Sequence, residues 1–358
     1  MEINKPSKDR VTPRCSVARQ CGGCQIQCLS YEEQLKFKQN KVYNNLVRIG
    51  GQDDFVMKDI IGMEEPFNYR NKAQFPVGID KEGNIVSGFY AGRTHSIIGI
   101  DSCDLGLKLD GRDINKEVMD IVKKFMTKYQ IEPYNEVTHK GLVRHVLIRI
   151  GAKTKQIMVC IIINGRKLPN KDELVEKLCK LEGMHSVSLN VNTNKSNVIL
   201  GSKIINLYGP GYIEDYIGDV KFRISPLSFF QVNPVQTEKL YNKALEYADL
   251  SGNEIVWDLY CGIGSISLFL AKKAKKVLGV EIVPEAIEDA RLNAKINKID
   301  NSEFFVGAAE DVVTEYFSKH ENEAECKPDV IVVDPPRKGC DEKLLSTIVK
   351  MNPKRVVY

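Results

Sequence analysis

The sequence is defined first by what it lacks. Its 358 residues contain no apolar run as long as a membrane-spanning helix needs, which excludes a membrane protein of that kind. No secretory signal precedes the polar residues 1–10, and we therefore expect the protein to be cytoplasmic. Internal repeats and low-complexity stretches are also missing. The net charge is only +4, which permits an RNA partner without requiring one.

The chain has enough length for two or three domains with a sizeable core. It also contains ten cysteines. Because the cytosol is reducing, clustered cysteines in a cytosolic protein are metal ligands more often than disulfides. The cysteines near the N-terminus are therefore candidates for a metal site.

Three of these cysteines are closely spaced. Cys15, Cys21 and Cys24 can turn three thiolates inward, and the Gly-Gly pair between the last two lets the loop wrap closely. A fourth ligand is either the nearby Cys28 or the remote Cys103. A remote fourth cysteine suits a [4Fe–4S] cluster, while a zinc knuckle and free reactive thiols are the alternatives.

The rest of the chain is organised around one strand–turn–helix–strand unit. Residues 255–259 are an apolar run, which predicts a buried parallel strand. Gly262 and Gly264 then allow a tight turn into a helix over residues 265–273, and a second strand ends at Glu281. Such a unit suits a nucleoside, because the glycines let it approach the backbone and the acid binds the ribose hydroxyls.

The charges near this unit favour S-adenosylmethionine (SAM) over a dinucleotide. A dinucleotide site has a third glycine next to the pyrophosphate, and Ser267 stands at that position. Asp258 lies in the first strand, Glu281 ends the second, and Asp334 follows a later one. Three carboxylates would repel a pyrophosphate but suit the sulfonium and ammonium groups of SAM. An NAD-linked oxidoreductase is therefore disfavoured. The alternative to a SAM site is a Rossmann-like unit whose glycines only allow the chain to turn and bind no ligand.

Residues 30–49 predict an amphipathic helix that begins with Ser30 as its N-cap. We expect its buried stripe to contain Leu35, Val42 and Leu46. The following region is mostly short strands, and several of them carry basic, amide and aromatic side chains. Such strands suit an RNA backbone and unstacked bases, with a solvated sheet face as the alternative. The residues concerned are Arg70, Asn71, Lys72, Gln74, Phe89, Tyr90, Arg93, His95, Arg144, His145 and Arg149.

The last third continues the alternation of helices and strands. Asn233 is a predicted N-cap for a helix that ends near Asp249, and Gln231 just before it is placed to bond the amino-acid end of the cofactor. The chain then predicts strands over 304–307 and 330–333 and from residue 355, with helices over 284–297, 309–317 and 341–351. In amino-group methyltransferases an aromatic residue follows Asp-Pro-Pro; Arg337 stands there in this chain, which argues against exocyclic-amine chemistry.

Five segments together carry a family resemblance. They are Cys15-x5-Cys21-Gly-Gly-Cys24, Tyr69-Arg-Asn-Lys-Ala-Gln-Phe-Pro-Val77, Phe229-Phe-Gln-Val-Asn-Pro234, Asp258-Leu-Tyr-Cys-Gly-Ile-Gly264 and Asp334-Pro-Pro-Arg-Lys-Gly339. With them the chain resembles, over nearly its whole length, the RNA uracil-5-methyltransferases of the TrmA/RumA type. These SAM-dependent enzymes methylate C5 of uridine in tRNA or 23S rRNA. The cysteines place the chain nearest the iron–sulfur branch that acts on 23S rRNA, since the tRNA enzymes of this type generally lack them.

The resemblance implies specific site residues. For SAM it implies contacts from Gln231, Tyr260, Glu281 and Asp334, to which the turn adds Asp258, Gly262 and Gly264. For the [4Fe–4S] cluster it implies Cys15, Cys21, Cys24 and Cys103 as ligands, with zinc as the alternative metal. We expect a monomer whose partner is RNA, most of all 23S rRNA, and which has no membrane contact.

The expected fold is α/β. A Rossmann-like, SAM-dependent methyltransferase domain is preceded by an N-terminal and central α+β RNA-binding domain that carries the cysteine cluster. We expect residues 1–29 to form the cysteine segment, 30–51 a helix that packs on the methyltransferase domain, 52–222 the central RNA-binding domain and 223–358 the methyltransferase domain, which stops in its fifth strand.

The catalytic residues of the family are expected outside these 358 residues. In the family a nucleophilic cysteine follows the fifth strand in a Ser-Cys-Asn-Pro-like turn, and a base Glu lies further on; both would come after Tyr358. The small N-terminal RNA-binding barrel of many members has no room before Cys15. Only Cys261 and Cys340 offer thiols near the expected site. We therefore expect no catalytic residue within the chain and an inactive chain as it stands. A non-catalytic, metal-containing RNA-binding module is the alternative function.

Overall fold

The computed structural model describes residues 5–320 and 327–358, so residues 1–10 and the first expected segment fall partly outside the described residues. Two compact units make up the chain, and each is described by itself. The first contains the residues up to Ile148, Val159–Leu181 and Ser188–Ile205; the second contains Arg149–Met158, Glu182–Val187 and Asn206–Tyr358. The four-segment division expected from the sequence stays a prediction. Among the described residues, no helix is long and apolar enough to cross a membrane.

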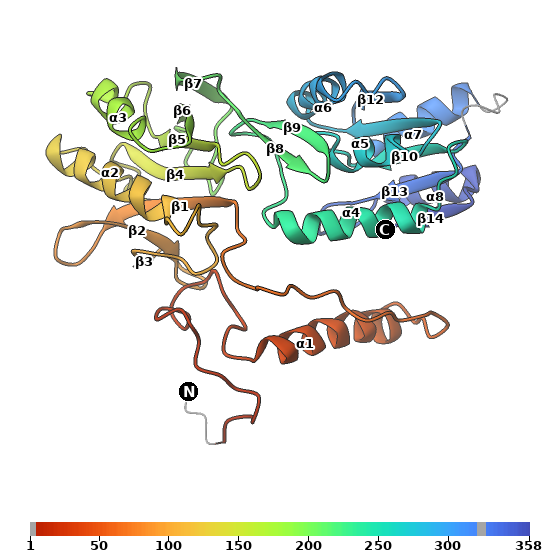
Figure 1. Cartoon of the computed structure of the whole chain (residues 1–358), viewed down its shortest axis with the longest axis horizontal. Helices are drawn as coiled ribbons and strands as arrows, with labels where there is room; N and C mark the ends of the chain where they lie inside the picture. The colour runs from red at the N-terminus through yellow and green to blue at the C-terminus, as the bar shows by residue number, and fades with distance from the viewer. Residues whose placement is uncertain (1–4, 321–326) are drawn as a thin grey trace. The chain divides into compact units, whose positions relative to one another are not determined.

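Strands between residues 72 and 208 form a seven-stranded sheet (Figure 1). Its order is β3-β2-β1-β4-β5-β6-β7, and β1 pairs antiparallel with β2, which pairs antiparallel with β3. The elements are β1 (Lys72–Ile79), β2 (Ile85–Tyr90), β3 (Ile97–Gly99), α2 (Ile114–Lys128), β4 (Val143–Ile150), β5 (Ile157–Ile163), α3 (Lys171–Leu178), β6 (Met184–Val191) and β7 (Lys203–Tyr208). Every residue of β4 and β5 is buried, so these two strands form the core of the sheet.

The helix expected near the N-terminus is present, but its expected buried stripe is wrong. Helix α1 (Tyr31–Asn44) continues into the π-helical turn η1 (Asn45–Ile49), and the Ser30 hydroxyl accepts the Glu33 N–H as an N-cap. No residue of α1 or η1 is buried, and Val42 and Leu46 are exposed. The helical period alone does not bury a stripe, because burial needs a partner surface packed against it.

The second unit contains a parallel sheet of the Rossmann type. Its order is β12-β11-β10-β13-β14, with all neighbours parallel. The elements are the hairpin β8 (Ile213–Ile217) and β9 (Val220–Ile224), then α4 (Pro234–Ala248), β10 (Ile255–Leu259), α5 (Ser265–Ala271), β11 (Lys276–Glu281), α6 (Pro284–Ile296), β12 (Ser302–Val306), α7 (Ala309–Lys319), β13 (Val330–Val333), α8 (Glu342–Met351) and β14 (Arg355–Val357). The expected α/β fold with a Rossmann-like domain is confirmed.

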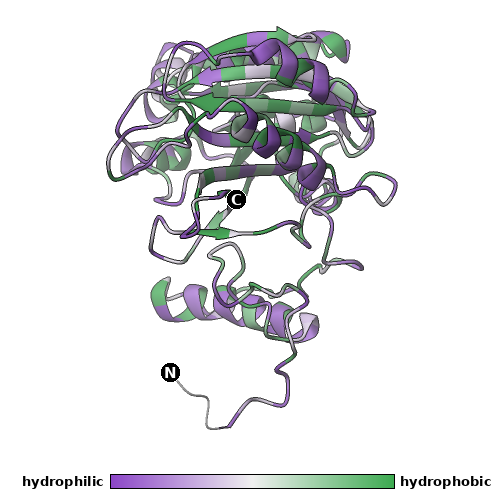
Figure 2. Cartoon of the chain, turned by 90° about the vertical axis from the view of Figure 1, so that its left-hand side faces the viewer, coloured by the Kyte–Doolittle hydropathy of each residue, from purple (hydrophilic) through white to green (hydrophobic). Residues whose placement is uncertain are grey.

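Side chains on opposite faces of this sheet form two cores. Trp257 and its neighbours on one face pack with buried residues of α7 and α8, such as Val313 and Leu344. Val256 on the other face packs with residues of α4 and α5, such as Ala248 and Leu270. Figure 2 shows hydrophobic positions gathered along strands, while the helices carry both kinds. Burial on both faces explains why the strand sequences are continuous apolar runs.

Candidate functional site

The second unit has a cavity of about 820 Å³ at the carboxyl ends of its parallel strands. In open parallel sheets ligands bind in this position, because the loops that leave the strands meet there. The described residues that line it are Phe229, Tyr260, Gly262, Val280, Glu281, Ile282, Gly307, Ala308, Ala309, Glu310, Asp334, Pro335, Pro336, Lys338, Gly339, Cys340, Asp341 and Glu342. Tyr260, Gly262, Glu281 and Asp334 of the expected SAM site are among them.

The turn between β10 and α5 requires an unusual backbone. Tyr260, Gly262 and Gly264 have φ values of 68°, 56° and 77°, which lie in the left-handed region. A Cβ on Gly264 would lie 3.1 Å from the Phe304 ring and 3.2 Å from Ala290 Cβ, so this glycine permits close packing. A Cβ on Gly262 would meet nothing within 4 Å. Gly262 therefore leaves free space where the backbone borders the cavity.

Glu281 is fixed at the tip of β11 by backbone donors. Its Oε2 accepts the Gly262 N–H at 3.2 Å, and its Oε1 accepts the Val283 N–H at 3.0 Å. These bonds hold the carboxylate at the mouth of the turn. Carboxylate oxygens have further lone pairs, so Glu281 can still accept bonds from hydroxyl groups of a ligand.

Asp258 does not line the cavity but lies beneath it. Only 1% of the residue is exposed, its Oδ2 accepts the Ser267 hydroxyl proton, and its Oδ1 has no partner among the described residues. Burial is the main cause that raises the pKa of Asp258 to about 7; Ser267 lowers this pKa in part, and the nearby carboxylates of Asp334 and Glu281 contribute to raising it. The three expected acids are thus neighbours, and Ser267 is a buried partner of one of them.

A network of buried polar groups holds the loop before α4. The guanidinium of Arg149, which is buried in β4, donates to the Ser228 carbonyl, and the Ser228 hydroxyl donates to Asp289 at 2.7 Å. The next residue, Phe229, is 68% exposed and lines the cavity. Gln231 lies two residues further along this loop, outside the cavity lining.

The two thiols near the cavity differ in exposure. Cys261 is buried, and burial together with Asp258 and Glu281 holds its pKa well above the usual range. Cys340 lines the cavity beside Tyr260, and burial raises its pKa as well. Burial also raises the pKa of Tyr260 to about 12, with Cys340 as the next cause. Both thiols are therefore protonated at neutral pH.

A second cavity, of about 160 Å³, lies among cysteines of the first unit. Cys15, Cys21, Cys24 and Cys103 all line it, together with Arg70, whereas Cys28 is not among the lining residues. Burial raises the pKa of Cys24 to about 11, with further contributions from Cys103, Cys21 and Cys15. In the part of the chain that the structure describes, no three His, Cys, Asp or Glu side chains are close enough to hold a single metal ion.

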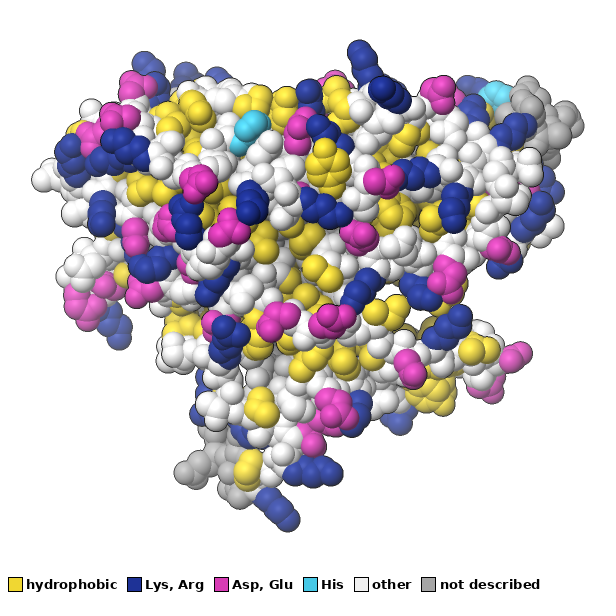
Figure 3. Space-filling view, viewed as in Figure 1, with side chains coloured by type: hydrophobic (Ala, Val, Ile, Leu, Met, Phe, Trp, Pro, Cys, Tyr) yellow, Lys and Arg dark blue, Asp and Glu magenta, His cyan; other side chains and the backbone are white. Residues whose placement is uncertain are grey.

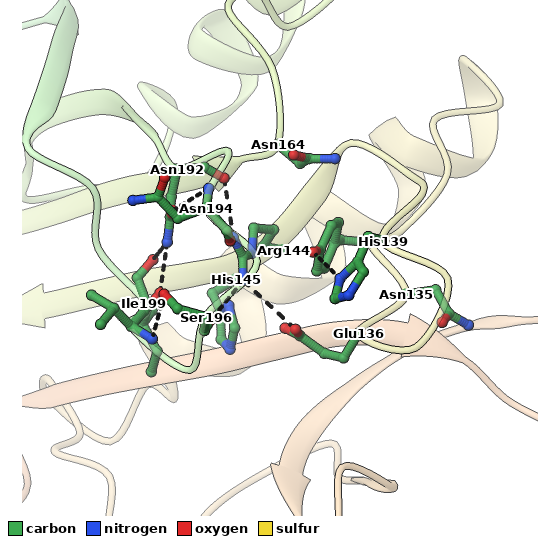
Figure 4. A network of polar contacts seen from close by, with 12 residues as sticks. Asn135, Glu136, His139, Arg144, His145, Asn164, Asn192, Asn194, Ser196 and Ile199 are labelled. Carbon is green, nitrogen blue, oxygen red and sulfur yellow. Dashed lines mark hydrogen bonds and ion pairs between the residues drawn. The ribbon is translucent and has the colours of Figure 1, made fainter.

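The basic residues of β4 do not form an open RNA-binding face, so that expectation is wrong. Arg144 is buried, and its guanidinium donates to the carbonyls of Asn192, Asn194 and Ser196 and lies 3.6 Å from Glu136, as Figure 4 shows. His145 and Arg149 are buried as well. These side chains stabilise loops inside the protein, because a buried charge must be paired or hydrogen-bonded.

The remaining candidates for RNA contacts lie in and around β1 and β2. Arg70, Arg93 and His95 are exposed, and Phe89 and Tyr90 are half-buried. Figure 3 shows lysine and arginine side chains interspersed with acidic ones over the face in view.

The family model for tRNA (uracil-5-)-methyltransferases matches residues 112–358. The chain belongs to this family. It is one of the RNA uracil-5-methyltransferases of the TrmA/RumA type.

Two relatives of this uracil-5-methyltransferase homologue align with its whole length. An uncharacterized RNA methyltransferase of Clostridium tetani is 50% identical over 360 residues, which cover 100% of this chain and 75% of the relative. One of Clostridium acetobutylicum is 48% identical and is covered to 76%. The crystal structure of Pyrococcus abyssi tRNA (uracil-54, C5)-methyltransferase in complex with S-adenosyl-L-homocysteine is similar with a TM-score of 0.77 and 28% identity, covering 99% of this chain and 77% of that one.

Several residues of the cavity received no role from the sequence, and two of them, Phe229 and Lys338, lie in segments that carry the family resemblance. Lys338 is the only cation among the described lining residues. The Phe-Phe pair offered a signal, because Phe230 is buried and its neighbour on the opposite side of an extended loop must then be exposed. Lys338 gave no comparable signal, since lysines on loops are common.

Proposed function

We propose that this chain binds SAM in the cavity at the ends of β10, β11 and β13 and serves the methylation of C5 of uridine in RNA. The arrangement of Glu281, Gly262 and Asp334 around that cavity carries the proposal. Family membership and the similar structure with S-adenosyl-L-homocysteine bound support it. The non-catalytic alternative is not favoured, because the relatives over the whole chain are described as methyltransferases.

Several residues in and beside the cavity have a proposed part in binding. Glu281, held by two backbone N–H groups, accepts bonds from the ribose hydroxyls. Gly262 leaves room for the nucleoside, and Phe229 offers an exposed ring on which a base can stack. Asp334 and the other nearby carboxylates favour a cationic ligand, which suits a sulfonium and opposes a pyrophosphate. Gln231 and Tyr260 complete the proposed SAM contacts, and Asp258 and Gly264 support the turn beneath them.

The proposed reaction needs a thiolate, because C5 of uracil is a weak nucleophile. A thiolate adds to C6, so that C5 becomes enolate-like. C5 then bonds to the methyl carbon of SAM as the carbon–sulfur bond breaks and S-adenosyl-L-homocysteine leaves. A base removes the C5 proton, and the electron pair left on C5 expels the thiolate from C6.

We propose that neither thiol near the cavity is this nucleophile. The pKa values of Cys261 and Cys340 are both raised, whereas a reactive cysteine needs a lowered one. The proposed nucleophile and base follow Tyr358, and the relatives are longer than the part that this chain matches.

The experiment is transfer of a tritiated methyl group from SAM to unmodified 23S rRNA. This chain is compared with a protein extended through the natural stop codon of its gene. We expect label on uracil C5 with the extended protein only. Transfer by this chain alone would show that an internal thiol acts, and Cys340→Ala and Cys261→Ala would identify it.

We further propose that the cysteine cavity holds a [4Fe–4S] cluster rather than zinc. Four thiols border one cavity from two segments that are far apart in the sequence, and Arg70 beside them offsets negative charge. A fourth cysteine that is remote in the sequence from a tight three-cysteine run suits a [4Fe–4S] cluster, and a zinc knuckle is the rival. The chemistry of the cluster here is structural: it ties the N-terminal loop to the segment after β3.

The proposed RNA is 23S rRNA, since the cysteines are those of the rRNA branch of the family. Unmodified tRNA is the control substrate in the transfer assay. Label on 23S rRNA alone supports the proposal, and label on tRNA alone would overturn this part while leaving the reaction intact.

A further inference from the structure

The first unit has an open groove that the proposed catalytic and cysteine sites do not use. Its volume is about 500 Å³, and it lies between the Gly22–Gly23 turn of the cysteine loop and the connection from β2 to β3. Phe89, Tyr90, Arg93 and His95 line it, and none of its described lining residues is acidic. The groove thus combines aromatic rings with positive charge.

The cysteine loop and the β2–β3 connection are joined by backbone contacts. Cys21 forms an antiparallel bridge with Ala91, and the Gly22 N–H donates to the Tyr90 carbonyl at 2.9 Å. A Cβ on Gly22 would lie 2.8 Å from that carbonyl oxygen, so only glycine permits this approach. One wall of the groove is therefore built by the cysteine loop itself, and Gly23 and Phe89 line both cavities.

The aromatic wall of the groove is held in place from behind. The rings of Tyr90 and His95 meet edge to face, with centroids 5.5 Å apart. The Tyr90 hydroxyl lies 3.4 Å from Nε2 of His145, which is buried in β4. Burial and the neighbouring Arg144 lower the pKa of His145 to about 4, so this imidazole is neutral at pH 7 and adds no charge. Tyr90 is a fixed platform, while His95 in front of it is exposed.

The loop also fixes a cation at the rim. Arg93 is exposed and has a φ of 65°, in a turn closed by the Thr94 N–H to the Ala91 carbonyl and by the Ala91 N–H to the Ser96 carbonyl. This turn presents the Arg93 side chain beside the aromatic wall rather than within the sheet. An aromatic surface with an adjacent arginine suits a single-stranded nucleotide, because bases stack on rings and arginine pairs with phosphate.

We propose that this groove binds an unpaired nucleotide of the RNA substrate, with its base stacked on the exposed ring of His95, which Tyr90 supports, and its phosphate at Arg93. The inference rests on the proposed function only in taking RNA as the substrate. It assigns a contact remote in sequence from the methyl-transfer site, and it gives the cysteine loop a part in RNA binding as one wall of the groove.

Binding to a fluorescein-labelled oligouridylate tests the groove directly. Fluorescence anisotropy is measured for the full chain and for His95→Ala and Arg93→Gln, with Arg166→Gln as a control at another exposed arginine of the first unit. We expect His95→Ala to weaken binding roughly tenfold, as loss of one stacked base does, and Arg93→Gln to weaken it several-fold and flatten its salt dependence. Arg166→Gln should change neither. Equal effects of all three variants, or none, would overturn the proposal.

Two further readouts separate this inference from the proposed function. SAM binding by the same variants should match that of the unchanged chain, because the groove is no part of the SAM cavity. Photocrosslinking to a 5-iodouridine-substituted oligouridylate should label a peptide that contains Tyr90 or His95. Crosslinks confined to other peptides would refute the groove even if methylation is confirmed, and groove crosslinks without any methylation would leave it standing.

Discussion

At the scale of single residues, the proposed SAM cavity has one glycine that leaves space beside it, Gly262. Gly262→Ala should lower SAM affinity about tenfold or more, because an added methyl group in a filled site costs roughly 1–3 kcal/mol. Gly51→Ala is the matched control: Gly51 also has a left-handed φ, of 63°, and its Cβ would also meet nothing within 4 Å, but it does not line the cavity. Both variants should lose similar stability, and calorimetry should find weaker SAM binding in Gly262→Ala only. Equal SAM binding by both would contradict the placement.

Asp258 should make the stability of the protein depend on pH. Its pKa of about 7 in the folded chain exceeds its ordinary value of 3.8, so the folded state holds a proton that the unfolded state releases. This carboxyl therefore contributes stability below about pH 4, and the contribution is lost as pH rises towards 7, by a few kcal/mol in all.

Asp258→Asn tests this dependence. Because the neutral amide can still accept the Ser267 hydroxyl proton, the variant should lose less stability than the unchanged chain between pH 5 and pH 8. Urea unfolding at both pH values measures the difference, with Asp249→Asn as an exposed control. If the unchanged chain and Asp258→Asn lost the same free energy of unfolding between pH 5 and pH 8, the buried carboxyl would not be the cause of the pH dependence.

At the scale of elements, two buried arginines of β4 stabilise two different loops. Arg149 bonds the loop that carries Phe229, and Arg144 bonds the loop at Asn192–Ser196. Arg149→Met should cost roughly 1–3 kcal/mol, because the Ser228 carbonyl loses its donor, and should also weaken SAM binding. Arg144→Met should cost a similar amount without changing SAM binding. Calorimetry on both variants measures this split, and weaker SAM binding by both or by neither would contradict it.

The elements of the second unit follow from the sequence more directly than those of the first. Its strands are apolar runs bounded by turn residues, and Asn233 caps α4 as expected, accepting the Gln236 N–H at 3.1 Å. Strand β4 carries Arg144, His145 and Arg149 and yet is buried along its whole length. The sequence placed these side chains on an RNA-binding or solvated face, because their partners lie far along the chain: loop carbonyls for the two arginines and the Tyr90 hydroxyl for His145. The predicted buried stripe of α1 was wrong for a related reason: a helical hydrophobic pattern does not specify which surface packs against it.

The candidate site was likewise only partly predictable. The Gly262 turn and the acids Glu281 and Asp334 could be predicted, because the carboxyl ends of neighbouring parallel strands lie together at one edge of the sheet. The burial of Asp258 beneath the cavity and the exposure of Phe229 were not, because both depend on how the loops close over the strand ends.

At the scale of the whole molecule, the cysteine cavity joins segments that only the folded chain brings together. Cys103→Ser should abolish iron and sulfide content after anaerobic purification, because Cys103 lines the cavity. Cys28→Ser should retain both, since Cys28 does not line it. Elemental analysis and visible absorbance measure the outcome. Equal iron in both variants would contradict the assignment of the fourth ligand, and stoichiometric zinc in the unchanged, colourless protein would contradict the cluster itself.

Isothermal titration calorimetry of the full chain tests whether the cavity at the ends of β10, β11 and β13 binds SAM. SAM and NAD are titrated separately into the same preparation. We expect saturable binding of SAM, with one molecule per chain, and no binding of NAD, because the acids around the cavity oppose a pyrophosphate. Binding of NAD without binding of SAM would contradict this expectation.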